Sequence, residues 1–164
     1  MTPSTFMVIA HRGASSCAPE NTLAAFDLAI RMGVRHIEFD VHSSRDGHLV
    51  VIHDDTLDRT TNGSGPVSNH TLAPLRELDA GSWFGAAFAG ERVPTFDDVL
   101  SRYGGRIHIH AENKGHSASL SRQRIWSASM AWWDTSPSPL SRRCVSRRSA
   151  LMPLSWPPDG WCRR

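Results

Sequence analysis

Two acidic side chains, Glu38 and Asp40, stand two positions apart inside a short apolar run. Alternate residues of a β-strand point to the same face, so both carboxylates are expected on one side of a strand. Like charges on a buried face repel unless a cation lies near them. Glu112 is a third acid at the end of another alternating run. Carboxylate oxygens are preferred ligands of Ca²⁺ and Mg²⁺, so these three acids predict a site for one such ion.

The acidic pair alone is also typical of an ordinary amphipathic strand with its polar face in solvent. Basic residues at the ends of the apolar runs favour a catalytic site over an ordinary solvent-exposed strand face. His11 and His53 could each move a proton near neutral pH, and Arg12 and Lys114 could donate to phosphate oxygens. Phosphodiester cleavage requires a base, an acid and positive charge around phosphorus. The residue types therefore indicate phosphodiester chemistry.

Strands and helices are expected to alternate along the first two thirds of the chain. A helix is expected after Pro19-Glu20, with Asn21 or Thr22 as its N-cap and Gly33 as its stop. A strand covered on both faces is expected over 6–10. The other expected elements are strands over 36–41, 49–52 and 106–114, and a helix from 96 to about 103.

A hairpin is expected to connect the second and third strands. Asp46-Gly47 predicts a two-residue turn, which would pair Arg45 with His48 and place Asp40 opposite His53. The hairpin would then return His53 to the face that carries the carboxylates. Residues 55–95 have little periodicity and are expected to form a long ordered insertion.

Charge and hydropathy narrow the class of protein. A formal net charge of +2 is too small to indicate nucleic-acid binding. No apolar run approaches the roughly 20 residues that span a bilayer, and residues 1–10 lack the features of a secretory signal. We therefore expect a cytoplasmic protein without a membrane span.

Several motifs, weak alone but specific in this order, closely resemble those of the glycerophosphodiester phosphodiesterase family. The resemblance runs from about Val8 to Gly115. The motifs are His11-Arg12-Gly13, Pro19-Glu20-Asn21-Thr22, Ile37-Glu38-Phe39-Asp40-Val41, Asp46-Gly47, Val51-Ile52-His53-Asp54, Leu57-Asp58-Arg59-Thr60-Thr61-Asn62-Gly63 and Glu112-Asn113-Lys114.

The resemblance implies an α/β fold, the N-terminal part of a TIM-type (β/α)8 barrel with its site at the C-terminal ends of the strands. It also implies hydrolysis of glycerophosphodiesters to glycerol 3-phosphate and an alcohol, in glycerophospholipid metabolism. His11 and His53 would be the acid/base pair. Glu38, Asp40 and Glu112 would hold Ca²⁺ or Mg²⁺. Arg12 and Lys114 would bind the substrate phosphate, and the insertion could contact glycerol or the head group.

Residues 116–164 differ from the rest of the chain. They contain eleven Ser, eight Arg, five Pro and five of the six Trp, without convincing periodicity. We interpret them as an irregular tail outside the family, produced by a frameshift after about Gly115; a genuinely divergent C-terminus is the alternative. A basic segment that contacts membrane or nucleic acid is a third, less favoured interpretation.

Other functions stay open at this point. A barrel normally needs about 250 residues, so the chain could be an inactive barrel fragment that self-associates through exposed strand edges. A phospholipase D-like or lyase activity on lipid head groups is the alternative within the same fold.

Overall fold

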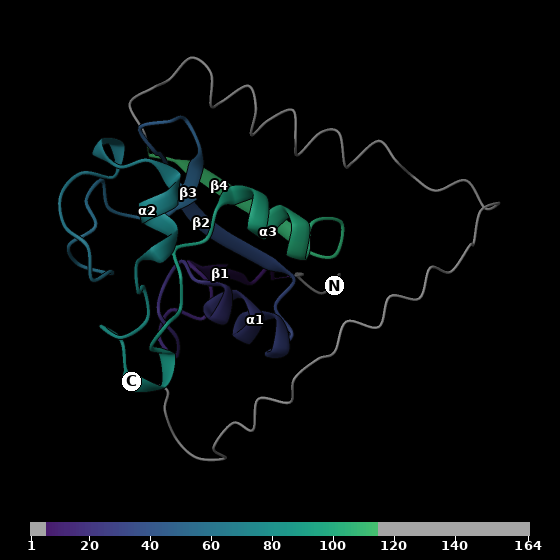
Figure 1. Ribbon diagram of the computed structural model, residues 1–164. Helices are drawn as coiled ribbons and strands as arrows, with labels where there is room; N and C mark the ends of the chain where they lie inside the picture. Colours follow the sequence, from purple (N-terminus) through teal and green to yellow (C-terminus); the bar gives the residue numbers. More distant parts are fainter. Residues whose placement is uncertain (1–5, 115–164) are drawn as a thin grey trace, which may run out of the picture.

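The computed structural model of the protein describes residues 6–114 (Figure 1). The tail that the sequence predicts from residue 116 onward lies outside this range. The described elements follow in chain order: β1 (Ile9–His11), α1 (Leu23–Arg31), β2 (His36–Ser43), β3 (Leu49–Val51), α2 (Leu72–Glu77), α3 (Phe96–Tyr103) and β4 (His108–Asn113). Two short 3-10 helices, Val67–Asn69 and Ala86–Phe88, lie in the insertion.

Strand β2 is the centre of a mixed sheet. Strand β1 pairs in parallel with the start of β2, and β4 pairs in parallel with β2 from His36 to Val41 at the opposite edge, whereas β3 pairs antiparallel with the end of β2. Three parallel strands thus lie side by side in the order in which the barrel strands of a (β/α)8 fold occur along the chain. The expected α/β fold with a parallel sheet is confirmed.

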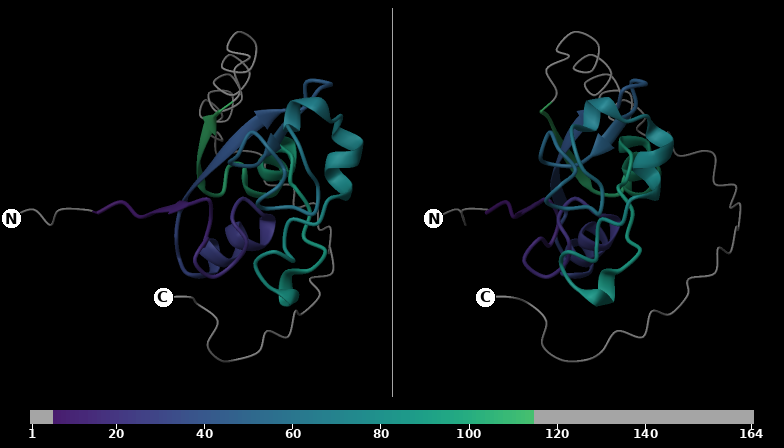
Figure 2. Two further views of the ribbon diagram at one scale, coloured as in Figure 1. Left: turned by 90° about the vertical axis from the view of Figure 1, so that its left-hand side faces the viewer. Right: turned by 60° about the vertical axis from the view of Figure 1, so that its left-hand side comes forward.

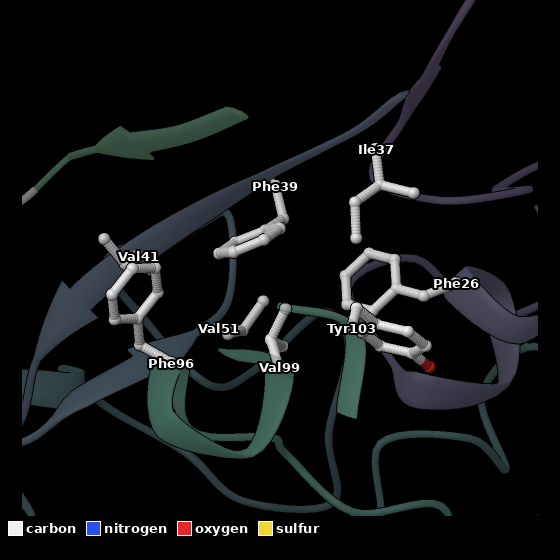
Figure 3. Packing of buried hydrophobic residues seen from close by; sticks show 8 residues of the cluster. All are labelled: Phe26, Ile37, Phe39, Val41, Val51, Phe96, Val99 and Tyr103. Carbon is white, nitrogen blue, oxygen red and sulfur yellow. The ribbon is translucent and has the colours of Figure 1, made fainter. Parts of the chain in front are cut away.

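The main core fills the space between the sheet and the two longer helices. Ile37, Phe39 and Val41 of β2 face Phe26 of α1 and Val99 of α3, and all five side chains are completely buried (Figure 3). Both helices therefore cover the same face of the sheet. A singly covered, parallel sheet is typical of an arc of a barrel, whereas a doubly wound sheet has helices on both faces.

The opposite face of the sheet carries the polar residues. Because side chains alternate along a strand, burial of Ile37, Phe39 and Val41 turns Glu38 and Asp40 to the other side. Strand β4 is in parallel register with β2, and its partner for Asp40 is Glu112. The acids therefore lie on the face that would form the interior of a barrel, towards the C-terminal ends of the strands.

The helix limits agree closely with the sequence. Thr22 caps α1 by accepting a hydrogen bond from the backbone N–H of Ala25, and Gly33 has a φ of +89° just after the last turn. A reciprocal capping box between Thr95 and Asp98 starts α3, as expected at residue 96.

The predicted cover of the first strand is wrong. Strand β1 has only three residues, and Phe6, Met7 and Val8 precede it with more than half of their surface exposed. Ile9 is also 38% exposed. Within residues 6–114, β1 pairs only with β2.

The insertion is ordered, as expected, and has its own small core. Val50 and Ile52 turn towards it and pack with Leu57, Val67 and Leu75. In Figure 2 the part of the insertion that contains α2 lies beside the hairpin, and the later teal part extends towards α1. Helix α2 within it was not predicted. Since Val51 faces the main core, the hairpin arm is buried on both sides, which fixes the chain just before His53.

The predicted hairpin turn is wrong by one residue. The backbone N–H of Ser44 donates to the carbonyl of His48, so the loop has three residues, and Gly47 takes a φ of +84°. Asp-Gly also fits this type of loop, in which the last residue is left-handed. The pairing continues with Val41 opposite Val51, and the N–H of Ile52 donates to the carbonyl of Asp40. Asp40 is therefore opposite Ile52, and His53 follows the end of the strand.

The three-residue loop predicts a position-specific effect of alanine. Gly47→Ala should destabilise the fold by roughly 1 kcal/mol, because a side chain at this φ is strained even though nothing lies within 4 Å of the added carbon. Gly85 is the matched control, since it also has free space but an extended φ of 173°. Urea denaturation of both variants measures the difference; equal stabilities would contradict the loop assignment.

Among the described residues, no helix combines the length and the apolar character needed to cross a membrane.

Candidate active site

Three carboxylates from two strands converge at the C-terminal end of the sheet. Oxygen atoms of Glu38, Asp40 and Glu112 all lie within 4.8 Å of one another. The geometry follows from two simple rules. Glu38 and Asp40 share a face because they are two residues apart, and Glu112 is the register partner of Asp40 on the adjacent parallel strand.

Asp40 is the buried centre of this group. Its carboxylate is 1% exposed and accepts a hydrogen bond of 3.2 Å from the Asn21 side-chain amide. Two cations flank it: Arg12 Nε lies 3.4 Å from one oxygen and Lys114 Nζ lies 3.5 Å from the other. Lys114 Nζ also lies 3.1 Å from a carboxylate oxygen of Glu112, and this hydrogen bond is the main reason why the pKa of Lys114 is raised.

The pKa of Glu38 shows the effect of the close packing of the acids. Burial raises the pKa of its carboxyl group, and the charge of Asp40 raises it further. Two carboxylates this close repel by about 3 kcal/mol at an effective dielectric constant of 20. Three acids against the two neighbouring cations Arg12 and Lys114 leave one negative charge without compensation. A divalent ion would supply the missing positive charge.

The donor set fits a hard cation. All three acids offer oxygen, the atom that Ca²⁺ and Mg²⁺ prefer, from two neighbouring strands. Asn21 adds a further indication: its side-chain oxygen is buried close to Asp40 and accepts no hydrogen bond within residues 6–114. A water molecule of a hydrated cation could donate to this oxygen. Exposed Glu112 leaves the group open on one side.

Arg12 is held in place by its backbone. It has a left-handed φ of +58°, an uncommon value for a residue other than glycine. Its N–H lies between the carbonyl and the side chain of Glu38, at 2.8 and 3.2 Å. The next residue, Gly13, cannot be replaced freely, because an added carbon would lie 2.8 Å from Ala25 of α1. The motif His11-Arg12-Gly13 therefore positions a cation beside the acids.

His11 stands next to Glu38 in the β1–β2 register. Its ring nitrogen Nε2 lies 3.9 Å from the Glu38 carboxylate, too far for a hydrogen bond, and its side chain is 68% exposed. The imidazole is therefore at the acids but accessible to a bound molecule.

His53 is oriented by its neighbour Asp54, at a distance of 2.6 Å from Nδ1 to the carboxylate. A hydrogen bond from Arg59 is the main reason why the pKa of Asp54 lies far below its usual range, so Asp54 is ionised and can only accept. His53 Nδ1 thus carries the proton, which leaves Nε2 available for proton transfer. His42 donates from Nε2 to the backbone carbonyl of His53 at 3.0 Å and fixes the chain there.

Three residues to which the sequence analysis gave no role connect His53 with the acidic group: Asp54, Arg59 and Glu20. Arg59 from the insertion forms paired hydrogen bonds with Asp54 and also with Glu20, and Glu20 accepts from Arg12 at 3.1 Å. These residues occurred in the quoted motifs, but only the folded loops bring them together. A chain of alternating charges thus runs from His53 to Asp40.

A model of the Glycerophosphoryl diester phosphodiesterase family matches residues 11–136. This match continues past Gly115, where we expected the resemblance to end. A putative glycerophosphodiester phosphodiesterase of Bacillus subtilis is 58% identical over 113 residues, which cover 69% of this chain and 46% of that protein. A glycerophosphodiester phosphodiesterase of Caldanaerobacter subterraneus is 56% identical over 98 residues, which cover 60% of this chain and 40% of that protein. The chain thus spans about half the length of the curated relatives it matches.

Solved structures show the same similarity. A glycerophosphodiester phosphodiesterase from Agrobacterium tumefaciens matches with a TM-score of 0.65 and 49% identity, covering 66% of this chain and 47% of that one. An Oleispira antarctica phosphodiesterase, in complex with the product sn-glycerol-3-phosphate, matches with a TM-score of 0.66 and 40% identity. That match covers 82% of this chain and 55% of the other.

Proposed function

Because this chain belongs to the glycerophosphoryl diester phosphodiesterase family, we propose that its site hydrolyses glycerophosphodiesters to glycerol 3-phosphate and an alcohol. One observation carries the proposal: three carboxylates that suit a divalent cation lie beside His11 and two phosphate-matching cations. A chain of hydrogen bonds and ion pairs through Asp54 and Arg59 connects His53 to this group. The Oleispira antarctica relative, which contains sn-glycerol-3-phosphate as its product, supports this choice of product.

Glu38, Asp40 and Glu112 would hold one Ca²⁺ or Mg²⁺. A bound divalent ion would supply positive charge for phosphoryl oxygens and lower the pKa of a bound hydroxyl group or water molecule. Arg12 and Lys114 would hold the phosphate through charge-assisted hydrogen bonds. Both cations contact Asp40, so the same carboxylate that attracts the ion also keeps them near it.

The two histidines would transfer protons. His53 carries a proton on Nδ1, and within residues 6–114 its Nε2 has no hydrogen-bond partner, which is the state of a base that removes a proton from an oxygen nucleophile. His11 is exposed beside Glu38, where it could protonate the departing alcohol. The reverse assignment of acid and base uses the same two residues.

Product analysis tests the function. The protein should convert glycerophosphocholine to glycerol 3-phosphate and choline with Mg²⁺ or Ca²⁺, and EDTA should stop the reaction. Phosphorus-31 NMR separates the alternatives: a cyclic phosphate as the final product would indicate a lyase, and turnover of lysophosphatidylcholine alone would indicate a phospholipase D-like enzyme. Folded protein without turnover would support the inactive-fragment alternative. Cytoplasmic location and self-association through strand edges stay predictions from the sequence.

A further inference from the structure

We propose that Arg59 is a positioning residue that holds the proton-transfer residue His53 and the phosphate-binding residue Arg12 in fixed relation to each other. The inference rests on the proposed function, because it assumes those two roles. Arg59 lies in the insertion and needs no direct contact with substrate. It would act through Asp54 on one side and through Glu20 on the other.

The contacts on the His53 side form a short chain. Arg59 donates from Nε and one terminal nitrogen to the two oxygens of Asp54, at 2.7 and 3.1 Å. Asp54 in turn accepts from His53 Nδ1 at 2.6 Å. A carboxylate held at both oxygens by a planar guanidinium has little freedom to rotate. The orientation of the His53 ring is therefore set by Arg59 as well as by Asp54.

The contacts on the Arg12 side use the other edge of the same guanidinium. Arg59 donates to both oxygens of Glu20, at 2.7 and 3.1 Å, and Glu20 accepts from Arg12 at 3.1 Å. Burial would raise the pKa of Glu20, but the two arginines overcome this effect and lower it. Glu20 is thus an ionised, largely buried link between Arg59 and Arg12.

Geometry explains why an arginine is needed. One side chain must satisfy four carboxylate oxygens, two from Asp54 nearby in the sequence and two from Glu20, which lies 39 residues before Arg59. Only the guanidinium offers enough donors in one plane, whereas a lysine ammonium is a point charge that cannot hold two carboxylates in fixed orientations. Arg59→Lys therefore retains the charge and removes the orientation.

Kinetics of Arg59→Lys and Arg59→Ala test the proposal, with Arg102→Lys as the matched control. Arg102 also forms a two-pronged contact with a carboxylate, Asp27, and has a similar exposure of 51% against 44%, but it lies on the outer helices. Both Arg59 variants lose the paired hydrogen bonds to Asp54 and Glu20. Each variant should therefore have a kcat roughly 10- to 100-fold lower than the wild type and should be inhibited less strongly by inorganic phosphate. The control should change neither.

Two further readouts separate positioning from mere stability. Guanidinium at non-denaturing concentration should restore part of the activity of Arg59→Ala, because the side chain is accessible to solvent. NMR of the His53 ring should show a hydrogen-bonded Nδ1 proton in the wild-type chain and in Arg102→Lys, and its loss in Arg59→Ala.

The NMR signal keeps this inference separate from the proposed function. If the wild-type chain does not hydrolyse the diester, the proposed function fails for this chain, while loss of the His53 signal in Arg59→Ala still supports positioning. An unchanged His53 signal in both Arg59 variants, or a fall in kcat no larger than that of Arg102→Lys, would overturn the inference.

Discussion

Replacement of His53 or His11 by alanine is expected to lower kcat for glycerophosphocholine by about 10²- to 10⁴-fold, the usual contribution of one positioned acid or base. For His53 the expectation follows from its orientation, since Asp54 holds the proton on Nδ1 and this leaves Nε2 as the proton acceptor. For His11 it follows from an exposed imidazole 3.9 Å from the Glu38 carboxylate. Initial rates at saturating substrate and Mg²⁺ measure the loss.

Folding is not expected to suffer in these variants. The side chains of His11 and His53 are 68% and 28% exposed, and neither belongs to the buried clusters of the fold. His48→Ala is the matched control, since this histidine is exposed and directly follows the hairpin loop. Retention of wild-type kcat by His11→Ala or His53→Ala, with His48→Ala equally active, would remove that histidine from the mechanism.

Glu38→Gln is expected to raise the half-saturating Mg²⁺ concentration at least roughly 100-fold, the upper end of what loss of a supporting residue costs, because this change removes a ligand charge itself. Activity at low Mg²⁺ should be lost in proportion. Glu77→Gln makes the same chemical change on the exposed side of α2 and should leave the Mg²⁺ dependence unaltered.

Glu38→Gln is also expected to keep or raise the stability of the fold in the absence of metal. Burial and Asp40 raise the pKa of Glu38 above its value in the unfolded chain, so ionisation of this group opposes folding as pH rises through that pKa. Neutral glutamine relieves this effect. In EDTA at neutral pH, Glu38→Gln should therefore melt at the same temperature as the wild type or higher. A clear fall in melting temperature would mean that the carboxylate has a structural role instead.

The sequence predicted the acidic cluster because strict alternation carries enough information. Glu38 and Asp40 share a face by their spacing, and Glu112 was expected as a third acid at the end of another alternating run, although the sequence did not say which strand lies beside it. Helix α3 has the expected limits: a capping box of Thr95 and Asp98 starts it at Phe96, and it ends at Tyr103, before Gly104. These features depend on neighbours within a few residues.

The missed features depend on geometry that local sequence does not determine. Asp-Gly is compatible with two-residue and three-residue loops, and the choice between them shifted His53 from the predicted position opposite Asp40 to one beyond the strand end. Arg59 contacts Glu20 across 39 residues, through loops without periodicity. No spacing rule connects such positions, so the link between His53 and Arg12 emerged only from the folded chain.

Calorimetric titration of Mg²⁺ and Ca²⁺ into the metal-free chain tests the central claim most directly. Convergence of Glu38, Asp40 and Glu112 within 4.8 Å predicts one bound divalent ion per chain, with binding that is lost in Glu38→Gln and retained in Glu77→Gln. Absence of binding to a folded wild-type chain, or equal affinity in Glu38→Gln, would contradict the assignment of these acids to a cation site and the hydrolysis proposed from it.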